Sequence, residues 1–317
     1  MEITNYKEGD EVHILKLFQS AFKSPLSQAY WKWRFIENPE NAIMIKLIWD
    51  DTILAGHYAV SPLKLNVDGE VILTALSMTT MTHPNYAGRG LFTELAKKLY
   101  QDESQQNGLK AVWGFPNNNS HYAFIKNLKW KNLEQIPTFS IDVDKIKKTE
   151  LSNISVGTTF NNKHISAQLK ISDCFKIKAE KSIAYLTWRY LKNPINKYHI
   201  FELKNNDTSY YAVTKIFASF VQKNRFEIDI VELIFPDDLE LLLDLMNVIK
   251  NYYNNFDLLK INLWLPLNSD KHLLLEKIGF INTSPITYLG VHVLDSDYKK
   301  LEEPKEWFYS MGDSDTY

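Results

Sequence analysis

The sequence of 317 residues has little of several features that mark specialised classes of protein. Its single cysteine, Cys174, excludes an internal disulfide and favours a reducing compartment. A formal net charge of -2 gives no electrostatic basis for binding nucleic acid or an anionic membrane. No stretch approaches the roughly 20 apolar residues of a membrane span. Residues 1–5 lack the basic start and apolar run of a signal peptide. These absences predict a cytoplasmic globular protein.

A stretch with two closely spaced glycines is the most informative part of the chain. Residues 82–93 read THPNYAGRGLFT and lie between an alternating apolar strand and an amphipathic helix. Gly88 and Gly90 allow the backbone to approach a ligand, and the following helix presents its free N–H groups. This pattern predicts a site for an anionic group, most often a phosphate. The alternative is a structural corner in which the glycines only relieve steric conflict.

Two other glycine-based sites fit the sequence less well. A Walker loop is excluded because no Gly-Lys-Ser/Thr follows the turn. A Rossmann site is disfavoured because the preceding segments read as an antiparallel meander, with no acidic residue at the end of a next parallel strand. The sequence also has no His, Cys, Asp and Glu set with the spacing of metal ligands.

The chain contains an internal repeat. Residues 30–35 (YWKWRF) recur as residues 185–190 (YLTWRY), and each copy is followed by Asn-Pro. A second pair, residues 115–120 and 265–269, occurs in the same order at nearly the same offset. Two ordered matches indicate a duplicated domain. We predict domains over residues 1–145 and 146–317, joined by a polar stretch.

Alternation and turn residues predict an α/β order of elements in the first copy. A hairpin is expected around Asp68-Gly69. The first helix is expected to carry Val12, Leu15, Phe18 and Phe22 on one face. The expected elements are a helix over residues 10–22, strands over 42–49, 53–60, 63–67 and 71–81, a helix from Leu91, a strand over 111–115, a helix over 120–128 and a strand over 137–143.

This order and the glycine turn resemble the GNAT superfamily of N-acetyltransferases, which transfer the acetyl group of acetyl-CoA to an amine. Its pyrophosphate motif is Arg/Gln-x-x-Gly-x-Gly/Ala. Here Gly90 matches the central glycine and Arg89 the variable basic residue, whereas Ala87 and Phe92 depart from the pattern. Backbone N–H groups make most contacts to phosphate in this motif, so the resemblance still implies acetyl-CoA as cosubstrate, with no metal. It assigns coenzyme binding to Met81, Thr82, Ala87, Gly88, Arg89, Gly90, Leu91, Phe92, Thr93 and Asn117.

A later segment extends the resemblance. Residues 114–117 and 128–130 resemble the strand, helix and Leu-Gly-Phe/Trp stretch of the superfamily, with Lys129 at the usual glycine position. In that family the strand separates from its neighbour, and the pantetheine arm lies in the gap. The resemblance implies two tandem GNAT-like domains of mixed α/β class, each with a mixed, mainly antiparallel sheet flanked by helices.

The reaction needs a base for the amine and an acid for the departing thiolate. The usual tyrosine acid of the family is replaced by Ile125, and Tyr122, about one turn earlier, is the best substitute. A half-buried core tyrosine is the alternative reading of Tyr122. His57 and His83 are the candidate bases, although a lone histidine is more often structural. Cys174 has no clear His partner and is expected to be a buried residue with a packing role only.

The second copy lacks the phosphate turn, because Pro236-Asp237-Asp238 has no glycine and its carboxylates repel phosphate. It is expected to shape the acceptor pocket or to be structural. The acidic tail resembles that of two-domain bacterial GNAT proteins of surface-sugar biosynthesis, which makes Asp313 and Asp315 candidates for holding or deprotonating the amine.

The sequence therefore predicts an acetyl-CoA-dependent N-acetyltransferase. Its partner is expected to be a small-molecule amine, first of all a nucleotide-linked amino sugar. A Fem-type aminoacyl transferase and a non-catalytic CoA- or sugar-binding module remain as alternatives, and the oligomeric state is open.

Overall fold

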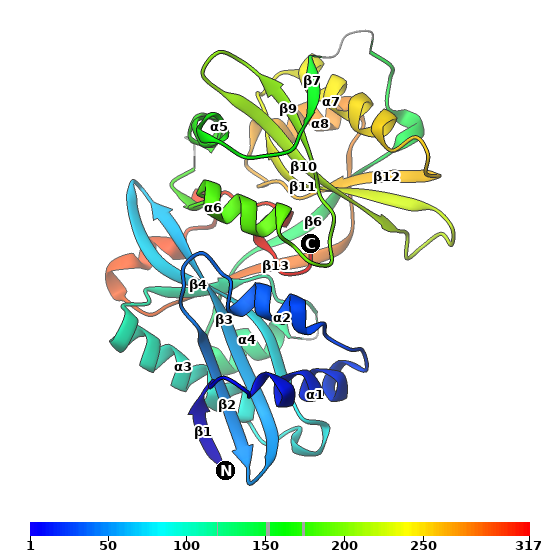
Figure 1. Ribbon diagram of the computed structural model, residues 1–317. Coiled ribbons are helices and arrows are strands. Elements are labelled where there is room, and N and C mark those ends of the chain that lie inside the picture. The colour runs from blue at the N-terminus through cyan, green and yellow to red at the C-terminus, as the bar shows by residue number, and fades with distance from the viewer. Residues whose placement is uncertain (119, 150–152, 173–174) are drawn as a thin grey trace. The chain divides into compact units, whose positions relative to one another are not determined.

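The structure is a computed structural model that describes residues 1–118, 120–149, 153–172 and 175–317 (Figure 1). Cys174 lies outside the described residues, so the expectation for its side chain stays a prediction. The chain divides into two compact units, and the strands β6 (Lys131–Asp142) and β13 (Ile281–Val293) each contribute residues to both. The first unit contains residues 1–134, 193–195 and 288–304, and the second contains residues 135–192, 196–287 and 305–317.

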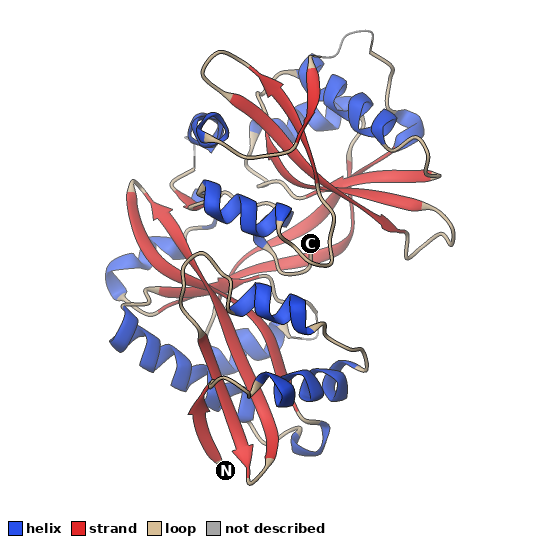
Figure 2. Ribbon diagram, viewed as in Figure 1, coloured by secondary structure: helices blue, strands red, loops and turns tan. Residues whose placement is uncertain are grey.

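The first unit is built on a mixed, mainly antiparallel sheet (Figure 2). Its strands follow the order β1-β2-β3-β4-β5-β13, and every neighbouring pair is antiparallel except the parallel pair β4 and β5. The expected hairpin is confirmed, because Val67 pairs with Glu70 and both turn residues have positive φ. The strands are β1 (Glu2–Asn5), β2 (Met44–Asp50), β3 (Ile53–Val67), β4 (Glu70–Thr82) and β5 (Ala111–Gly114).

Helices cover both faces of this sheet (Figure 1). Tyr58 of β3 packs with α3 and α4 in the main core of the unit. The side chain of the preceding residue, His57, points to the other face of the sheet and contacts Phe35 of α2. This follows from the alternation of side chains along a strand. The helices are α1 (Glu11–Phe22), α2 (Gln28–Phe35), the short η1 (Pro84–Tyr86), α3 (Leu91–Asn107), α4 (His121–Leu128) and η4 (Ser296–Glu302).

The buried face of α1 differs from the expected one. The helix itself is confirmed, but its fully buried residues are Ile14 and Leu17. Val12 and Phe22, which were expected on the apolar face, are each 50% exposed. Apolar side chains thus extend around more of α1 than its buried face, and those outside that face remain exposed to solvent.

The second unit also has a mixed, mainly antiparallel sheet. Its order is β7-β9-β10-β11-β12-β6, with the parallel pair between β11 and β12. This repeats the pattern of the first unit. The other strands of this sheet are β7 (Ile154–Gly157), β9 (His199–Lys204), β10 (Ser209–Ala218), β11 (Phe226–Ile234) and β12 (Leu258–Leu263). The second unit also contains the short strand β8 (Ile177–Ala179), which is not part of this strand order. The predicted mixed α/β class with mainly antiparallel sheets flanked by helices is confirmed.

Two helices, α7 and α8, pack on one face of this second sheet and enclose its main core. The longer of the two is α7, which begins directly after Asp238. No helix of the described chain is both long enough and apolar enough to span a membrane. The helices are η2 (Val143–Lys145), α5 (Asn162–Ser172), α6 (Ile183–Leu186), the π-helical η3 (Thr187–Leu191), α7 (Leu239–Tyr252), α8 (Asp270–Ile278), η5 (Pro304–Glu306) and η6 (Met311–Asp313).

The repeated YWKWRF and YLTWRY segments are both helical. Each helix begins after a serine whose side chain caps it: Ser27 accepts from the N–H of Tyr30, and Ser182 accepts from the N–H of Tyr185. The capping serines are therefore part of the repeat. The duplication itself and the assignment of residues 1–145 and 146–317 to two copies stay predictions.

Candidate active site

The N-terminus of α3 is open to a ligand. Its N-cap residue is Gly90, which has no side chain to satisfy the first N–H groups of the helix. Gly88 and Gly90 have φ values of 76° and 78°, in the left-handed region that favours glycine. A Cβ atom at either position would meet nothing within 4 Å. The turn is therefore an exposed group of backbone donors at the positive end of a helix dipole.

The edge of β4 beside this turn lacks a strand partner. Pairing of β4 with β5 ends at Leu76 and Trp113, although β4 continues to Thr82 and remains paired with β3 on its other side. Thr79 has a φ of 49° where the register between β3 and β4 shifts, which is a β-bulge. Among the described residues, β4 and β5 thus separate at the position where the resemblance places the pantetheine arm.

The residues expected to bind the coenzyme surround these two features. Arg89 extends over the ring of Tyr86 at 4.8 Å from its centroid and remains exposed, so its charge is available beside the turn. Asn117 accepts hydrogen bonds from Ser120 and marks the start of α4. Of the remaining residues, Met81 and Leu91 are buried, Thr82, Phe92 and Thr93 are half-buried, and Ala87, Gly88 and Gly90 are exposed.

The two candidate histidines occupy different environments. His57 is fully buried, and its Nδ1 donates to the carbonyl oxygen of Thr79 at 2.8 Å. Burial lowers the pKa of His57 to about 4, so its ring is neutral near pH 7. His83 is half-buried and its Nδ1 accepts from the N–H of Asn85 at 3.3 Å. His83 therefore caps η1 locally, and His57 is the less suited of the two to act as a base at neutral pH.

The predicted acid, Tyr122, lies on the outer surface of α4. Its side chain is 64% exposed, and its hydroxyl accepts a hydrogen bond from Lys126 one turn later. Ile125, at the position of the family's usual tyrosine, packs against the main core of the unit. No hydroxyl group on α4 thus occupies that position.

A chain of buried hydrogen bonds, which the sequence did not indicate, leads to the separation of β4 and β5. Trp130 Nε1 donates to the Tyr100 hydroxyl at 3.1 Å. The hydroxyls of Tyr100 and Tyr58 are 2.7 Å apart, and the Tyr58 hydroxyl is 3.0 Å from Ser77 Oγ. The four side chains come from α3, β3, β4 and the loop between α4 and β6, so no sequence spacing connects them.

The direction of this chain follows from its first member, because an indole N–H can only donate. The hydrogen of Tyr100 then goes to Tyr58, and that of Tyr58 goes to Ser77. The reverse order would leave a buried hydroxyl hydrogen without an acceptor, which costs about 1–3 kcal/mol. Burial raises the pKa of both tyrosines, so both keep their hydrogens at neutral pH.

The tail residues belong to the second unit. Asp313 is buried, lies 2.8 Å from Lys181 Nζ and accepts from the N–H of Ser310. Lys181 also pairs with the buried Glu232 at 2.6 Å. Asp315 is exposed. Asp313 thus has a structural ion pair, while the proposed roles of both aspartates toward an amine stay predictions.

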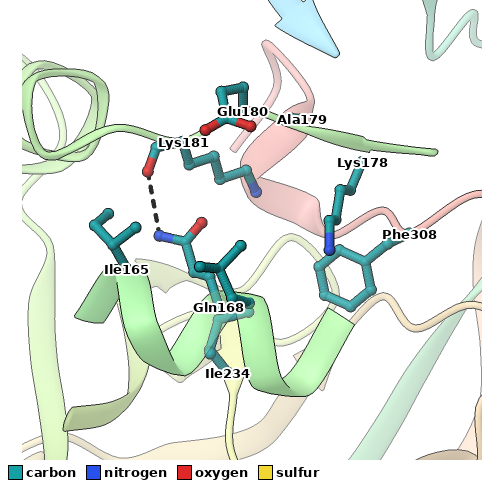
Figure 3. A pocket seen from close by; sticks show the side chains of 9 residues that line it. Ile165, Gln168, Lys178, Ala179, Glu180, Lys181, Ile234 and Phe308 are labelled. Atoms are coloured by element: carbon teal, nitrogen blue, oxygen red, sulfur yellow. Dashed lines mark hydrogen bonds between the residues drawn. The ribbon is translucent and has the colours of Figure 1, made fainter. Parts of the chain in front are cut away.

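A small pocket lies next to this ion pair (Figure 3). Gln168 of α5 donates to the backbone oxygen of Lys181, and Phe308 and Ile234 contribute apolar surface. Its volume of about 30 Å³ accommodates water rather than a substrate.

Comparison with known proteins agrees with this geometry. Residues 2–132 match the family model described as an acetyltransferase (GNAT) domain. This segment contains the glycine turn, the separated strands and the hydroxyl chain. This part of the chain is therefore similar to a GNAT acetyltransferase domain. No curated protein matched the sequence.

Solved structures share the fold over most of the chain. A GCN5-related N-acetyltransferase from Anabaena variabilis is 14% identical, with a TM-score of 0.68 over 93% of this chain and 73% of that one. A second, from Kribbella flavida, is 12% identical, with a TM-score of 0.66 over 93% and 72%. Saccharomyces cerevisiae N-myristoyltransferase, solved with bound myristoyl-CoA, is 9% identical, with a TM-score of 0.61 over 92% and 80%. At these identities the similarity shows a common fold.

Proposed function

We propose that the first unit transfers the acetyl group of acetyl-CoA directly to a primary amine. The observation that carries this proposal is the uncapped N-terminus of α3 beside the unpaired edge of β4. The turn offers backbone donors and the Arg89 charge for a pyrophosphate, and the strand edge offers backbone donors for an extended amide-containing arm. The match of residues 2–132 to an acetyltransferase domain supports the same reading.

The chain's own groups then have separate tasks. N–H groups of residues 88–93 bind phosphate, and a backbone N–H on the free edge of β4 polarises the acyl carbonyl as charge develops. Acetyl-CoA supplies an activated acyl group on a thiol leaving group. Both substrates bind together, because direct attack needs no covalent enzyme intermediate. Of the two candidate histidines, His83 is the better placed to remove a proton from the amine.

The acceptor proposed for first testing is a nucleotide-linked amino sugar, in a cytoplasmic setting. This choice depends on the resemblance of the tail to that of surface-sugar enzymes. A panel of amines therefore includes amino sugars, polyamines and amino acids, and release of free thiol measures turnover.

Binding of acetyl-CoA by calorimetry is the primary test, with Gly90→Ala as the diagnostic variant. A methyl group at Gly90 enters the open space in front of the turn and forces a non-glycine residue into a left-handed conformation. Loss of one charge-assisted hydrogen bond weakens binding by roughly 10- to 100-fold. Gly69→Ala and Gly108→Ala are matched controls, because both glycines also have positive φ and free space for a Cβ.

All three variants should lose about 1–2 kcal/mol of stability from backbone strain. Only Gly90→Ala should weaken binding of acetyl-CoA. Equal affinity in all three variants, or absence of binding by the wild type at millimolar acetyl-CoA, would reject the proposed site.

A non-catalytic CoA-binding module is the second candidate. The packing of Ile125 in the core favours it, because α4 lacks the expected acid. Tight binding of acetyl-CoA without thiol release across the amine panel would support this candidate over the enzyme.

A further inference from the structure

The hydrogen-bonded chain from Trp130 ends at the boundary between paired and unpaired β4. Ser77 is the first residue beyond the last pair with β5. Of the four residues in the chain, Trp130, Tyr100 and Tyr58 are buried and Ser77 is half-buried. The chain therefore reaches accessible space at Ser77.

The direction of the chain leaves Ser77 with a hydrogen to donate. Its Oγ accepts from Tyr58, so its own hydrogen points elsewhere, and no described group accepts it. Gly114 lies beside it on β5. A Cβ at Gly114 would be 3.7 Å from Ser77 Cβ and 3.3 Å from its carbonyl oxygen. The glycine thus keeps the space next to Ser77 free of side-chain atoms.

We propose that Ser77 is a catalytic residue whose hydroxyl donates a hydrogen bond to the sulfur of the acyl thioester. This assignment rests on the proposed acyl transfer. In that reaction the C–S bond breaks as the C–N bond forms, sulfur keeps the bonding electron pair, and the proton of the amine passes to the base, for which His83 is the candidate, and from there to solvent. Ser77 keeps its own proton and stabilises the negative charge on the departing sulfur.

Ser77 provides a hydroxyl donor for the leaving sulfur, which α4 does not. The residue at the family's tyrosine position is Ile125, and the Tyr122 hydroxyl is exposed and bonded to Lys126. Tyr58, Tyr100 and Trp130 are positioning residues, because they fix the direction in which the Ser77 hydroxyl donates without meeting the substrate.

Calorimetry with CoA and desulfo-CoA, in which hydrogen replaces the thiol, isolates the contact to sulfur. Wild type should bind CoA more tightly than desulfo-CoA. Ser77→Ala should remove this preference, and Ser77→Thr, which keeps a hydroxyl on a strand-compatible side chain, should retain it. Ser61→Ala is the matched control, since Ser61 is a buried serine of β3 bonded to Asn38 outside the chain.

Kinetics provide the second readout. Ser77→Ala should lower kcat roughly 10- to 100-fold, the effect of a hydrogen bond to a charged group, with little change in KM for the amine. Tyr58→Phe should lower kcat, and the preference for CoA over desulfo-CoA, less than Ser77→Ala does. Tyr298→Phe is its control, because that hydroxyl binds Glu70 outside the chain.

The outcomes separate the two proposals. If the wild-type protein binds neither CoA nor desulfo-CoA, both the proposed acyl transfer and the Ser77 assignment are overturned. If wild type and Ser77→Ala bind and show the same preference for CoA over desulfo-CoA, the Ser77 assignment alone is overturned. Loss of that preference in Tyr122→Phe, with the preference of Ser77→Ala unchanged, overturns it as well. Thermal unfolding of Ser77→Thr and Ser77→Ala checks that both variants are folded.

Discussion

Ending the chain after residue 145 should prevent the first unit from folding. This cut removes the half of β13 that pairs with β5, in which Gly290, Val291, His292 and Val293 oppose Ala111 to Gly114. It also removes the ion pair of Asp295 with Lys110 at 2.9 Å. The remaining segment has the glycine turn but leaves an open sheet edge next to it.

The expected loss is comparable to the stability of a domain. About four ladder hydrogen bonds contribute roughly 0.5–1.5 kcal/mol each. The fully buried Leu289 and the nearly buried Val291 contribute about 1.5–3 kcal/mol each. Together these terms amount to about 5–12 kcal/mol, against a typical total of 5–15 kcal/mol. His292, stacked on Tyr100 at 5.2 Å, is lost as well.

The assay is urea unfolding followed by circular dichroism, with acetyl-CoA binding as the functional readout. The control chain joins residues 1–134 to residues 288–304 through a long flexible linker and restores the missing strand. We expect no cooperative transition for residues 1–145 and a cooperative transition with binding for the control. A truncated chain that unfolds cooperatively and binds like the full chain would refute the reasoning.

Three further predictions concern buried charges and pH. Lys181→Met leaves two buried carboxylates without their cation and should lower the free energy of unfolding in urea by about 3–5 kcal/mol. Burial lowers the pKa of His57 from its ordinary value of 6.5 to about 4. The unfolded chain therefore binds the extra proton, and stability should fall by roughly 3 kcal/mol as pH decreases between these values; His57→Gln should flatten that slope in pH-dependent unfolding. Burial raises the pKa of Asp229 from 3.8 to about 7, so its contribution should fall by roughly 4 kcal/mol as pH increases through that window, and Asp229→Asn should remove the decrease.

Much of the fold could be predicted from local pattern. The hairpin at Asp68-Gly69 has turn residues that accept positive φ, and α7 has strong helical periodicity. The helix α2 was missed, because its buried Trp31, Trp33 and Phe35 alternate like the residues of a strand. Two separate strands, over residues 53–60 and 63–67, were expected where β3 is continuous, since Pro62 between them still pairs in register with Ala75.

Tertiary relationships account for what the sequence could not indicate. The strands β6 and β13 have a similar alternation of polar and apolar residues, so this pattern does not predict which strand each one pairs with. In the structure Val291 of β13 pairs with β5, and Ile141 of β6 pairs with β12. The same limit applies to the site. The glycine turn is local and was predicted, whereas the contact of Ser77 with Tyr58 depends on how β3 and β4 are paired, and the neutral state of His57 depends on burial.

The two units show why one helix N-terminus suits a phosphate and the other does not. In α7 the N-cap residue is Asp238, whose carboxylate accepts from the N–H of Leu241 at 3.0 Å. That side chain satisfies a helix donor and places negative charge at the dipole's positive end. In α3 the N-cap is Gly90, which leaves the equivalent donors to a ligand and adds no charge. An anion at the N-terminus of α3 would therefore take the place that the Asp238 carboxylate fills in α7, whereas in α7 the same anion would meet that carboxylate.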